Sequence, residues 1–218
     1  MKQMRLVSAL YQEDGPFMTI PVFNAFETVD NPDELKEGDV LVVWGGGDIS
    51  PTLYNKAVGM AYASEAPSRR DLLEWRLMQQ AKAMNIPIIG VCRGGQMITA
   101  LQGGHLIQHV NNHSGGGHNI NILKDNKELR VNSIHHQMMV PPANGEYEII
   151  AVASPSLSDV YSDVDDSGNI EHVTMDFEPE FIYYPSIRGF AVQWHPEGMS
   201  NNHPTNVWLN SFIQEKLV

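Results

Sequence analysis

The sequence contains a single cysteine, Cys92, in 218 residues. One cysteine cannot close a disulfide within the chain, so the fold does not depend on oxidation, and a reducing compartment such as the cytoplasm is the expected location. An apolar run long enough to cross a bilayer is also missing, and residues 1–10 lack the apolar core of a signal peptide. These absences predict a soluble cytoplasmic protein without a membrane anchor.

Basic residues are scarce, because 14 Lys and Arg stand against 26 Asp and Glu and give a net charge of −12. Binding to nucleic acid relies on basic side chains that neutralise phosphates, so this charge argues against a nucleic-acid partner. Much of the acidity falls within residues 158–187. We interpret that stretch as a solvated surface excursion that covers a pocket or contacts a partner.

Hydrophobic residues make up 42% of the chain, which is enough for a sizeable core, and one globular domain over residues 1–218 is the simplest expectation. Strand signals alternate with helix signals through the first half, a pattern typical of an α/β fold with a mostly parallel sheet. Residues 111–118 are rich in Asn, Gly and His and are expected to form a mobile loop. Strands are expected at residues 4–9, 39–44, 86–91, 149–153, 181–184 and 189–194, with helices at 69–84, between Cys92 and Gly103, and after Pro204.

Cys92 stands where the expected strand 86–91 passes into a helix. Gly90 and Gly94 flank it and permit the tight turn that lifts a nucleophile clear of a sheet. The positive end of the helix dipole would favour the reactive thiolate, and the side chain would be presented to solvent. A buried structural cysteine is the alternative, since most free cysteines are of that kind. The cysteine alone leaves both interpretations open.

A base and its orienting group follow in the segment 194–197, directly after the last expected strand. Pro196 favours an extended conformation at His195, and residues two apart on an extended segment project to the same side. Glu197 can therefore contact the imidazole at the end of a strand, where α/β sheets gather their active sites. Alone, such a pair is more often an ordinary structural contact. Together with Cys92 it forms a candidate catalytic triad.

The glycine run 45–47 follows another expected strand and is a candidate for part of an oxyanion hole. The backbone N–H groups of Gly46 and of Arg93, the residue after the cysteine, could bind the oxyanion that forms when a thiolate adds to a carbonyl. A simple tight turn is the alternative for the glycines. A phosphate-binding loop is disfavoured, because no Lys-Ser or Lys-Thr pair follows them.

Several segments together resemble a known family. Residues 90–96 (GVCRGGQ), 131–137 (VNSIHHQ) and 193–197 (QWHPE) are similar in order and spacing to class I glutamine amidotransferase-like proteins. Residues 45–51 and 70–74 bring the likeness closer to the γ-glutamyl hydrolase branch, of the γ-glutamyl-γ-aminobutyrate hydrolase type.

The resemblance implies a doubly wound, flavodoxin-like α/β fold with flanking helices, and a γ-glutamyl thioester formed on Cys92 by the candidate triad. Gln96 would contact the glutamyl part of the substrate. Ser133, His135 and His136 would hold its α-amino and α-carboxyl groups. For the two histidines, a turn held by imidazole hydrogen bonds is the alternative.

Trp44 departs from the family pattern, which has a small residue at this position, and we expect it to narrow the pocket mouth. Four further histidines have no partnering cysteine and no clear ligand spacing. We therefore expect loop or surface positions for them, with no metal site and no cofactor; they are His105, His109, His113 and His118.

Three functions remain open at this point. The first is a free-standing hydrolase of glutamine or a γ-glutamylated amine, acting alone or as a homodimer on a small-molecule substrate. The second is a glutaminase subunit that delivers ammonia to a separate synthetase, since 218 residues leave no room for an ATP-binding synthetase domain. The third is a catalytically silent binding module, which the intact triad disfavours.

Overall fold

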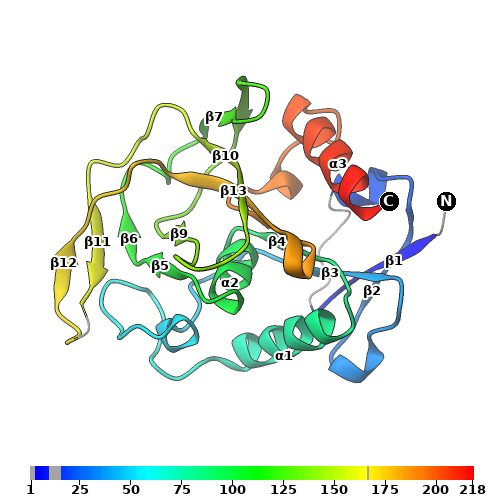
Figure 1. The fold of residues 1–218 in the computed structure, drawn as a ribbon, viewed down its shortest axis with the longest axis horizontal. Coiled ribbons are helices and arrows are strands. Elements are labelled where there is room, and N and C mark those ends of the chain that lie inside the picture. The colour runs from blue at the N-terminus through cyan, green and yellow to red at the C-terminus, as the bar shows by residue number, and fades with distance from the viewer. Residues whose placement is uncertain (1–2, 10–15, 166) are drawn as a thin grey trace.

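The computed structural model describes residues 3–9, 16–165 and 167–218, and this part of the chain is built on a nine-stranded sheet (Figure 1). The strand order is β2-β1-β3-β4-β14-β13-β10-β7-β8. Neighbouring strands are parallel from β2 to β14 and antiparallel from β14 to β8. In sheet order the strands are Phe23–Thr28, Met4–Ser8, Asp39–Val43, Ile88–Val91, Gly189–Val192, Pro179–Tyr184, Glu148–Ala153, His118–Ile122 and Lys127–Val131.

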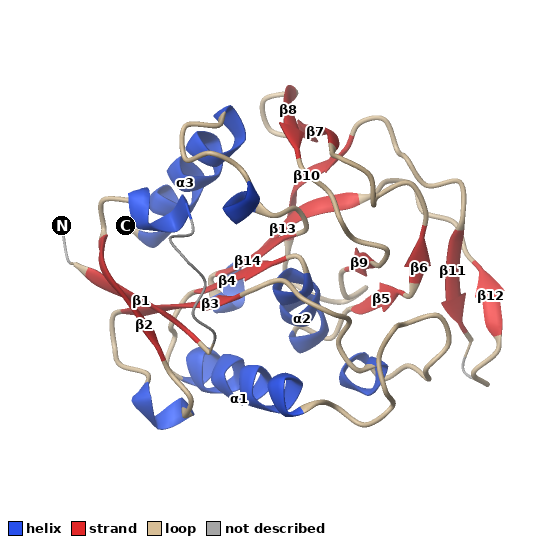
Figure 2. Ribbon diagram, turned by 180° about the vertical axis from the view of Figure 1, so that it is seen from behind, coloured by secondary structure: helices blue, strands red, loops and turns tan. Residues whose placement is uncertain are grey.

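Helices cover both faces of this sheet (Figure 2). The helices α1 (Arg69–Ala83) and α2 (Arg93–Leu101) pack on one face, and α3 (Pro204–Leu217) packs on the other. α1 begins where expected, because Ser68 and Asp71 form a reciprocal capping box that satisfies backbone N–H groups of its first turn. The doubly wound α/β arrangement is thereby confirmed.

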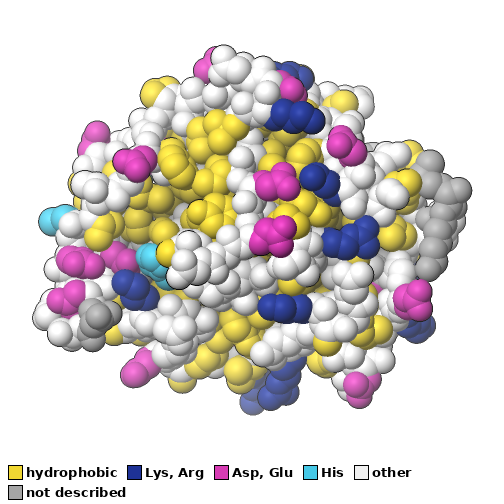
Figure 3. All heavy atoms as spheres, viewed as in Figure 1, with side chains coloured by type: hydrophobic (Ala, Val, Ile, Leu, Met, Phe, Trp, Pro, Cys, Tyr) yellow, Lys and Arg dark blue, Asp and Glu magenta, His cyan; other side chains and the backbone are white. Residues whose placement is uncertain are grey.

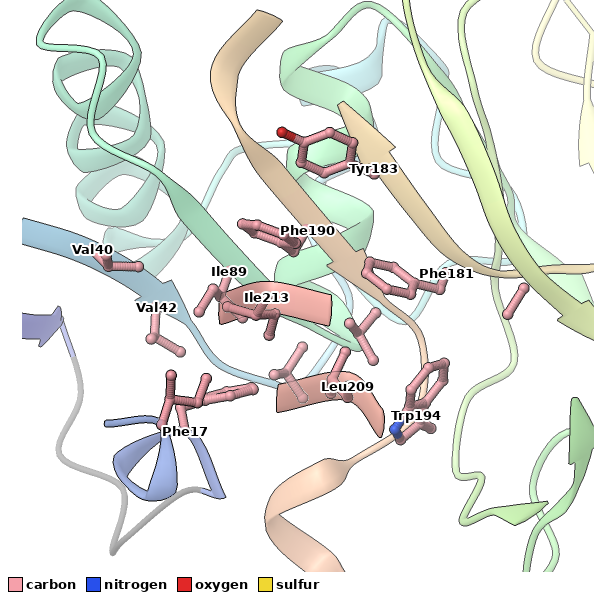
Figure 4. Close-up of a cluster of buried hydrophobic side chains, with 14 of the residues drawn as sticks. Phe17, Val40, Val42, Ile89, Phe181, Tyr183, Phe190, Trp194, Leu209 and Ile213 are labelled. Atoms are coloured by element: carbon pink, nitrogen blue, oxygen red, sulfur yellow. The ribbon is translucent and has the colours of Figure 1, made fainter. Parts of the chain in front are cut away.

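The face under α3 holds an aromatic core (Figure 4). Leu209 and Ile213 of α3 are fully buried against sheet residues such as Phe190. Trp44 belongs to this core and stacks on Phe17 with ring centroids 5.8 Å apart. The expectation that Trp44 narrows the pocket mouth is wrong, because its side chain is turned into the interior and is fully buried.

Residues 105–140 contain strands that the sequence did not indicate. None of them is longer than five residues, so a two-residue periodicity has little length over which to show. In addition to β7 and β8 they are β5 (His105–Ile107), β6 (His109–Val110) and β9 (Met138–Val140). Two small sheets result, with β5 paired to β9, and β6 paired to β11 (Tyr161–Val164), which also pairs β12 (Ile170–His172).

The acidic stretch 158–187 is only partly a surface excursion. The β11–β12 hairpin projects from the body of the molecule (Figure 1), but β13 is buried along its whole length. Asp163, Glu178 and Glu180 are at most 3% exposed. The interpretation of this stretch as solvated is therefore wrong for these three carboxylates.

The remaining helical elements are single 3₁₀ turns that begin at prolines, at Pro16–Thr19, Pro32–Glu34, Pro51–Tyr54, Pro185–Ile187 and Pro196–Gly198. None of the helices in the described ranges has the length and apolar character needed to span a membrane. On the face shown in Figure 3, acidic and basic side chains are interspersed among apolar patches and form no continuous basic surface.

Candidate active site

Cys92 lies at the turn between β4 and α2, with a backbone φ of +49° that non-glycine residues rarely adopt. The turn is possible because of its glycines. A Cβ at Gly94 would lie 1.9 Å from the carbonyl oxygen of Val43, and a Cβ at Gly90 would lie 2.4 Å from the backbone of Gly94. The expected nucleophile elbow is therefore present, and its backbone strain is held by close packing on both sides.

The thiol itself is less open than the sequence led us to expect. Cys92 is 6% exposed and so is not presented freely to solvent. The amide nitrogen of Gln193 lies 3.7 Å from Sγ, and the Gln96 amide lies 3.5 Å from that of Gln193. Both glutamines are almost fully buried, so they line the base of the site beside the sulfur.

His195 and Glu197 meet as the sequence predicted. Nδ1 of His195 lies 2.7 Å from Oε1 of Glu197 across the 3₁₀ turn that Pro196 begins. Asn132 fixes the backbone of His195 from both sides, since its side-chain oxygen accepts from the His195 N–H at 2.9 Å and its amide donates to the His195 carbonyl at 2.7 Å. A Cβ at Gly45 would lie 2.5 Å from the imidazole, so this glycine allows the ring its position. Sequence reasoning assigned no role to Asn132, although it lies within the segment 131–137.

The surroundings of His195 favour its protonated form. Burial by itself would lower the pKa of this imidazole, but the adjacent Cys92 and Glu197 side chains raise it to about 10. The cause is the proximity of two groups that carry negative charge when ionised. At neutral pH the arrangement therefore stabilises an imidazolium next to the sulfur.

The glycine loop is anchored to α1 and α2 by a buried network of ions. Arg70 donates to the carbonyl oxygens of residues 44 and 45, at 3.0 and 2.9 Å, and its Nε lies 3.1 Å from Glu74. Glu74 also binds the buried Arg93 side chain, whose second nitrogen binds Asp71. The Arg93 side chain is thus engaged in ion pairs within the protein.

The sequence profile of the peptidase C26 family matches residues 3–197. The chain belongs to the peptidase C26 family. Similar proteins include NtpR of Enterococcus hirae, at 29% identity over 96% of this chain and 87% of that protein. The glutamine amidotransferase-like protein YvdE of Lactococcus lactis is 29% identical over 73% of this chain and 66% of its own length.

The small chain of carbamoyl phosphate synthase from Buchnera aphidicola is also similar, with 26% identity over 60% of this chain and 29% of that protein. Among solved structures, a glutamine amidotransferase from Thermotoga maritima superposes with a TM-score of 0.58 over 100% of this chain and 96% of that one. Its sequence identity of 16% makes the likeness one of fold. The recognised resemblance and the fold class are confirmed by these matches.

In this peptidase C26 chain, the predicted substrate-binding residues form two groups. Gln96 and His136 lie next to Cys92 and the glycine loop, whereas the side chains of Ser133 and His135 bind other protein groups. Gln96 lies beside Cys92, and Nε2 of His136 lies 3.0 Å from Oδ1 of Asp48, directly after the glycine loop. Ser133 donates its hydroxyl to the carbonyl of His113, and His135 binds the carbonyl of Gln137. The Ser133 and His135 side chains therefore contact other parts of the protein.

The four further histidines, which were expected at loop or surface positions, fall into two groups by exposure. His105 and His109 are partly exposed, as expected. His113 lies in a loop, as expected, although it is 0% exposed. His118 lies in β7 and is 7% exposed, so the expectation is wrong for His118. The loop containing His113 is also packed rather than loose, because its backbone binds residues 133–135. Sequence spacing gave no signal for this burial, since the contacting residues come from distant segments.

Proposed function

We propose that this chain is a cysteine hydrolase that cleaves a γ-glutamyl amide, either glutamine or a γ-glutamylated amine, to glutamate and ammonia or the free amine. The observation that carries the proposal is the nucleophile elbow at Cys92 beside a His195 that is oriented by Glu197 at 2.7 Å. This is the arrangement of a nucleophile, a base and an orienting group. Membership of the peptidase C26 family supports hydrolase chemistry.

In the proposed reaction, the Cys92 thiolate adds to the amide carbonyl carbon and forms a C–S bond, while an electron pair moves onto the oxygen. The C–N bond then breaks as the ring nitrogen of His195 that does not face Glu197 gives its proton to the leaving amine, which leaves a γ-glutamyl thioester. Water next loses a proton to the same nitrogen and adds to the thioester carbon. The C–S bond breaks, glutamate leaves, and the thiolate is restored.

The transient oxyanion would be bound by the backbone N–H groups of Gly46 and Arg93. Gly46 has a φ of +152°, and a Cβ there would lie 2.3 Å from the Arg70 guanidinium, so the loop's backbone geometry depends on glycine. Among the described residues, neither N–H donates to a protein acceptor. Loss of one such donor typically reduces kcat by about a hundredfold to a thousandfold.

Gln96 would contact the glutamyl part of the substrate, and the segment 133–136 would hold its α-amino and α-carboxyl groups. His136, whose Nε2 lies 2.9 Å from Oδ2 of Asp48, would contact the substrate from the side of the glycine loop. The side chains of Ser133 and His135 bind other protein groups, and so do the backbone N–H and carbonyl of His135, so these two residues would act by holding the segment in place. A site that pairs polar groups with the substrate rejects analogues lacking those groups, because its own polar atoms are then left unpaired.

The proposal is tested by comparing glutamine and γ-glutamyl amines with matched amides that lack the α-amino or α-carboxylate group. Glutamyl substrates should react faster by on the order of ten thousandfold. Rapid quenching followed by intact-mass measurement should trap a glutamyl adduct, and the Cys92→Ala protein should show neither adduct nor turnover. Equal rates for glutamine and a simple aliphatic amide, with no adduct, would refute the substrate assignment.

The similarity to a carbamoyl phosphate synthase small chain supports a second candidate, a glutaminase subunit that supplies ammonia to a separate synthetase. Turnover by the purified chain alone, as a monomer or homodimer, favours the hydrolase. Turnover only after a synthetase is added favours the subunit, and no turnover or adduct under either condition indicates a silent binding module. We further propose that residues 1–218 act as one domain in the cytoplasm, where Cys92 stays reduced.

A further inference from the structure

Four polar side chains from separate parts of the chain meet in the interior near one end of β7 and β13. Glu180 of β13 is fully buried, and its Oε1 faces three imidazoles. It lies 3.4 Å from Nδ1 of His113, 3.1 Å from Nε2 of His118 and 3.4 Å from Nε2 of His135. We call these four residues the His–Glu cluster. The mechanism proposed above gives no role to their side chains.

Hydrogen bonds do not account for the contacts inside the cluster. Within the described residues, neither oxygen of Glu180 and neither nitrogen of His113 or His118 has a partner in hydrogen-bonding geometry, and the same holds for Nε2 of His135. The N···O distances are short enough for hydrogen bonds, but the ring N–H bonds do not point at the carboxylate oxygens. Buried polar atoms without partners destabilise a folded protein. A cluster of them therefore requires an explanation.

The contacts that the imidazole rings make outside the cluster show which ring nitrogen carries the proton. Nδ1 of His135 lies 3.0 Å from the carbonyl oxygen of Gln137, which can only accept, so Nδ1 carries the proton. A neutral ring protonated at Nδ1 turns the lone pair of Nε2 toward Glu180.

The proton of His113 is assigned from a contact outside the cluster as well. Its Nε2 lies 3.1 Å from Oε2 of the buried Glu178, whose negative charge favours a proton on that nitrogen. The other nitrogen, Nδ1, then directs a lone pair at Glu180. A carboxylate surrounded by lone pairs is stable only if a positive charge lies among them.

We propose that the His–Glu cluster is a binding site for a divalent cation of the zinc class, with His113, His118 and Glu180 as ligands and His135 as the fourth. One ligand atom from each of the first three residues lies within 4.8 Å of the others. Bonds of about 2.0–2.1 Å to a tetrahedral zinc ion separate its ligands by roughly 3.4 Å. The 3.1–3.4 Å contacts around Glu180 are close to that spacing. Imidazole and carboxylate ligands suit zinc better than calcium or magnesium, which prefer oxygen.

The surroundings of the cluster match the support that metal ligands receive. Histidine ligands usually donate their second N–H to a carboxylate or a backbone carbonyl. The carbonyl of Gln137 occupies that position for His135, and Glu178 lies 3.1 Å from Nε2 of His113 as an ion-pair partner without hydrogen-bond alignment. Glu178 is itself fixed, since it accepts from the backbone N–H groups of Leu157 and Ser158 at 2.7 Å.

A metal here would be structural, because four protein ligands leave no open position. It would join the loop before β7, the segment 133–136 and β13. The backbone of Glu180 also connects to the active site, since its carbonyl accepts from the N–H of Gln193, whose amide contacts the Cys92 sulfur. The inference stands on different residues from the proposed hydrolase function and does not depend on it.

The test is a titration of chelator-treated protein with Co²⁺, carried out in a Cys92→Ala background so that no thiolate can bind metal. We expect one Co²⁺ per chain with the visible absorption of a tetrahedral complex, and an increase in Tm when Zn²⁺ is added. His118→Ala should weaken binding by at least about a hundredfold. The control is His172→Ala, which removes an exposed imidazole outside the cluster and should leave binding unchanged.

A second variant covers the case in which His118→Ala does not fold. Glu178→Gln keeps the size of a side chain that touches no metal and removes the charge that orients His113, so affinity should fall by about tenfold to a hundredfold. The proposal is overturned if the parent protein takes up no stoichiometric Co²⁺. It is also overturned if His118→Ala or Glu178→Gln binds the ion as tightly as His172→Ala does.

Discussion

The imidazole of His195 is held by contacts on several sides. Glu197 binds Nδ1, Asn132 fixes the backbone through two hydrogen bonds, and Gly45 leaves room for the ring. A general base must keep both its position and its protonation state during the reaction. The geometry at this residue therefore ties the chemistry of Cys92 to contacts from three separate segments.

The first prediction is that Cys92 and His195 act as one unit. Cys92→Ala should reduce kcat by several orders of magnitude without unfolding the protein, and His195→Ala should do so as well. The double variant should be little worse than either single one, because a base has no role without its nucleophile. Steady-state rates of all four proteins measure this coupling. If the two losses multiplied in full, the triad assignment would be wrong.

The second prediction concerns pH. His195 must be protonated to give a proton to the leaving amine, and its pKa is raised to about 10. Activity should therefore decline as the pH rises through about 10, where the imidazolium loses its proton. Glu197 is one of the groups that raise this pKa, so Glu197→Gln should move the alkaline limb of kcat/KM to lower pH. An alkaline limb that stays in place in Glu197→Gln would contradict this assignment.

At the scale of elements, the elbow is set by how closely β3, β4 and α2 approach one another. α2 begins directly after Cys92, and Gly94 in its first turn touches the backbone of β3. Gly95 is similarly close to β14, since a Cβ there would lie 2.9 Å from the carbonyl oxygen of Val192. The helix can lie this near the sheet only because these positions have no side chain.

The third prediction is that Gly94→Ala destabilises the fold. The added Cβ would lie 1.9 Å from the carbonyl oxygen of Val43, so either β3 or α2 must move. We expect the free energy of unfolding to fall by about 3 kcal/mol or more. Gly115→Ala is the control, since nothing lies within 4 Å of its added Cβ, and its effect should stay within about 0.5 kcal/mol. Urea unfolding curves of the two variants provide the comparison.

At the scale of the whole molecule, charge is distributed unevenly between surface and interior. The net charge of −12 is mostly carried by exposed carboxylates, but the antiparallel half of the sheet encloses carboxylates and imidazoles together. In the folded state the pKa values of His135 and Glu180 are both lowered. The pKa of His135 is lowered by burial against the opposing influence of Glu180; burial would raise that of Glu180, but His118 and His135 lower it to about 2.

The fourth prediction is that the metal-free protein loses stability in acid. The unfolded chain binds a proton at His135 near its ordinary pKa of 6.5, whereas the pKa of His135 is lower in the folded protein, so stability falls as the pH drops below about 6.5. Glu180 adds to this loss between its ordinary pKa of 4.5 and about 2. Urea unfolding in chelator at pH 7, 5 and 3.5 measures the effect. Glu180→Gln should flatten the acid dependence, and an unchanged slope would contradict the prediction.

The features that were predicted correctly are those encoded by neighbouring residues. The capping box at Ser68 marked the start of α1, and the glycines around Cys92 marked the elbow. The contact of His195 with Glu197 was predicted correctly from their spacing, although a 3₁₀ turn and not an extended segment brings them together. Each of these depends on backbone geometry over a few residues, which the local sequence controls.

The features that were missed depend on packing between distant segments. Trp44 was expected at the pocket mouth, but its side chain stacks on Phe17 in the interior. Cys92 was expected to face solvent, but it is covered by Gln193, which lies 101 residues away in sequence. The strands β5 to β9 are too short for their periodicity to stand out, so pairing with neighbours decides that they form.

The sequence alone therefore determined the fold class and the candidate triad, because strand-turn-helix geometry and a two-residue spacing are local properties. Only the tertiary structure assembled the His–Glu cluster, since residues 113, 118, 135 and 180 share no spacing that marks a site. They meet because the loop before β7 packs on residues 133–135, and because β7 and β13 belong to the same sheet, one on each side of β10. Burial there removes water from the imidazoles and from Glu180, and it is this loss of solvent that gives ordinary loop histidines the character of metal ligands.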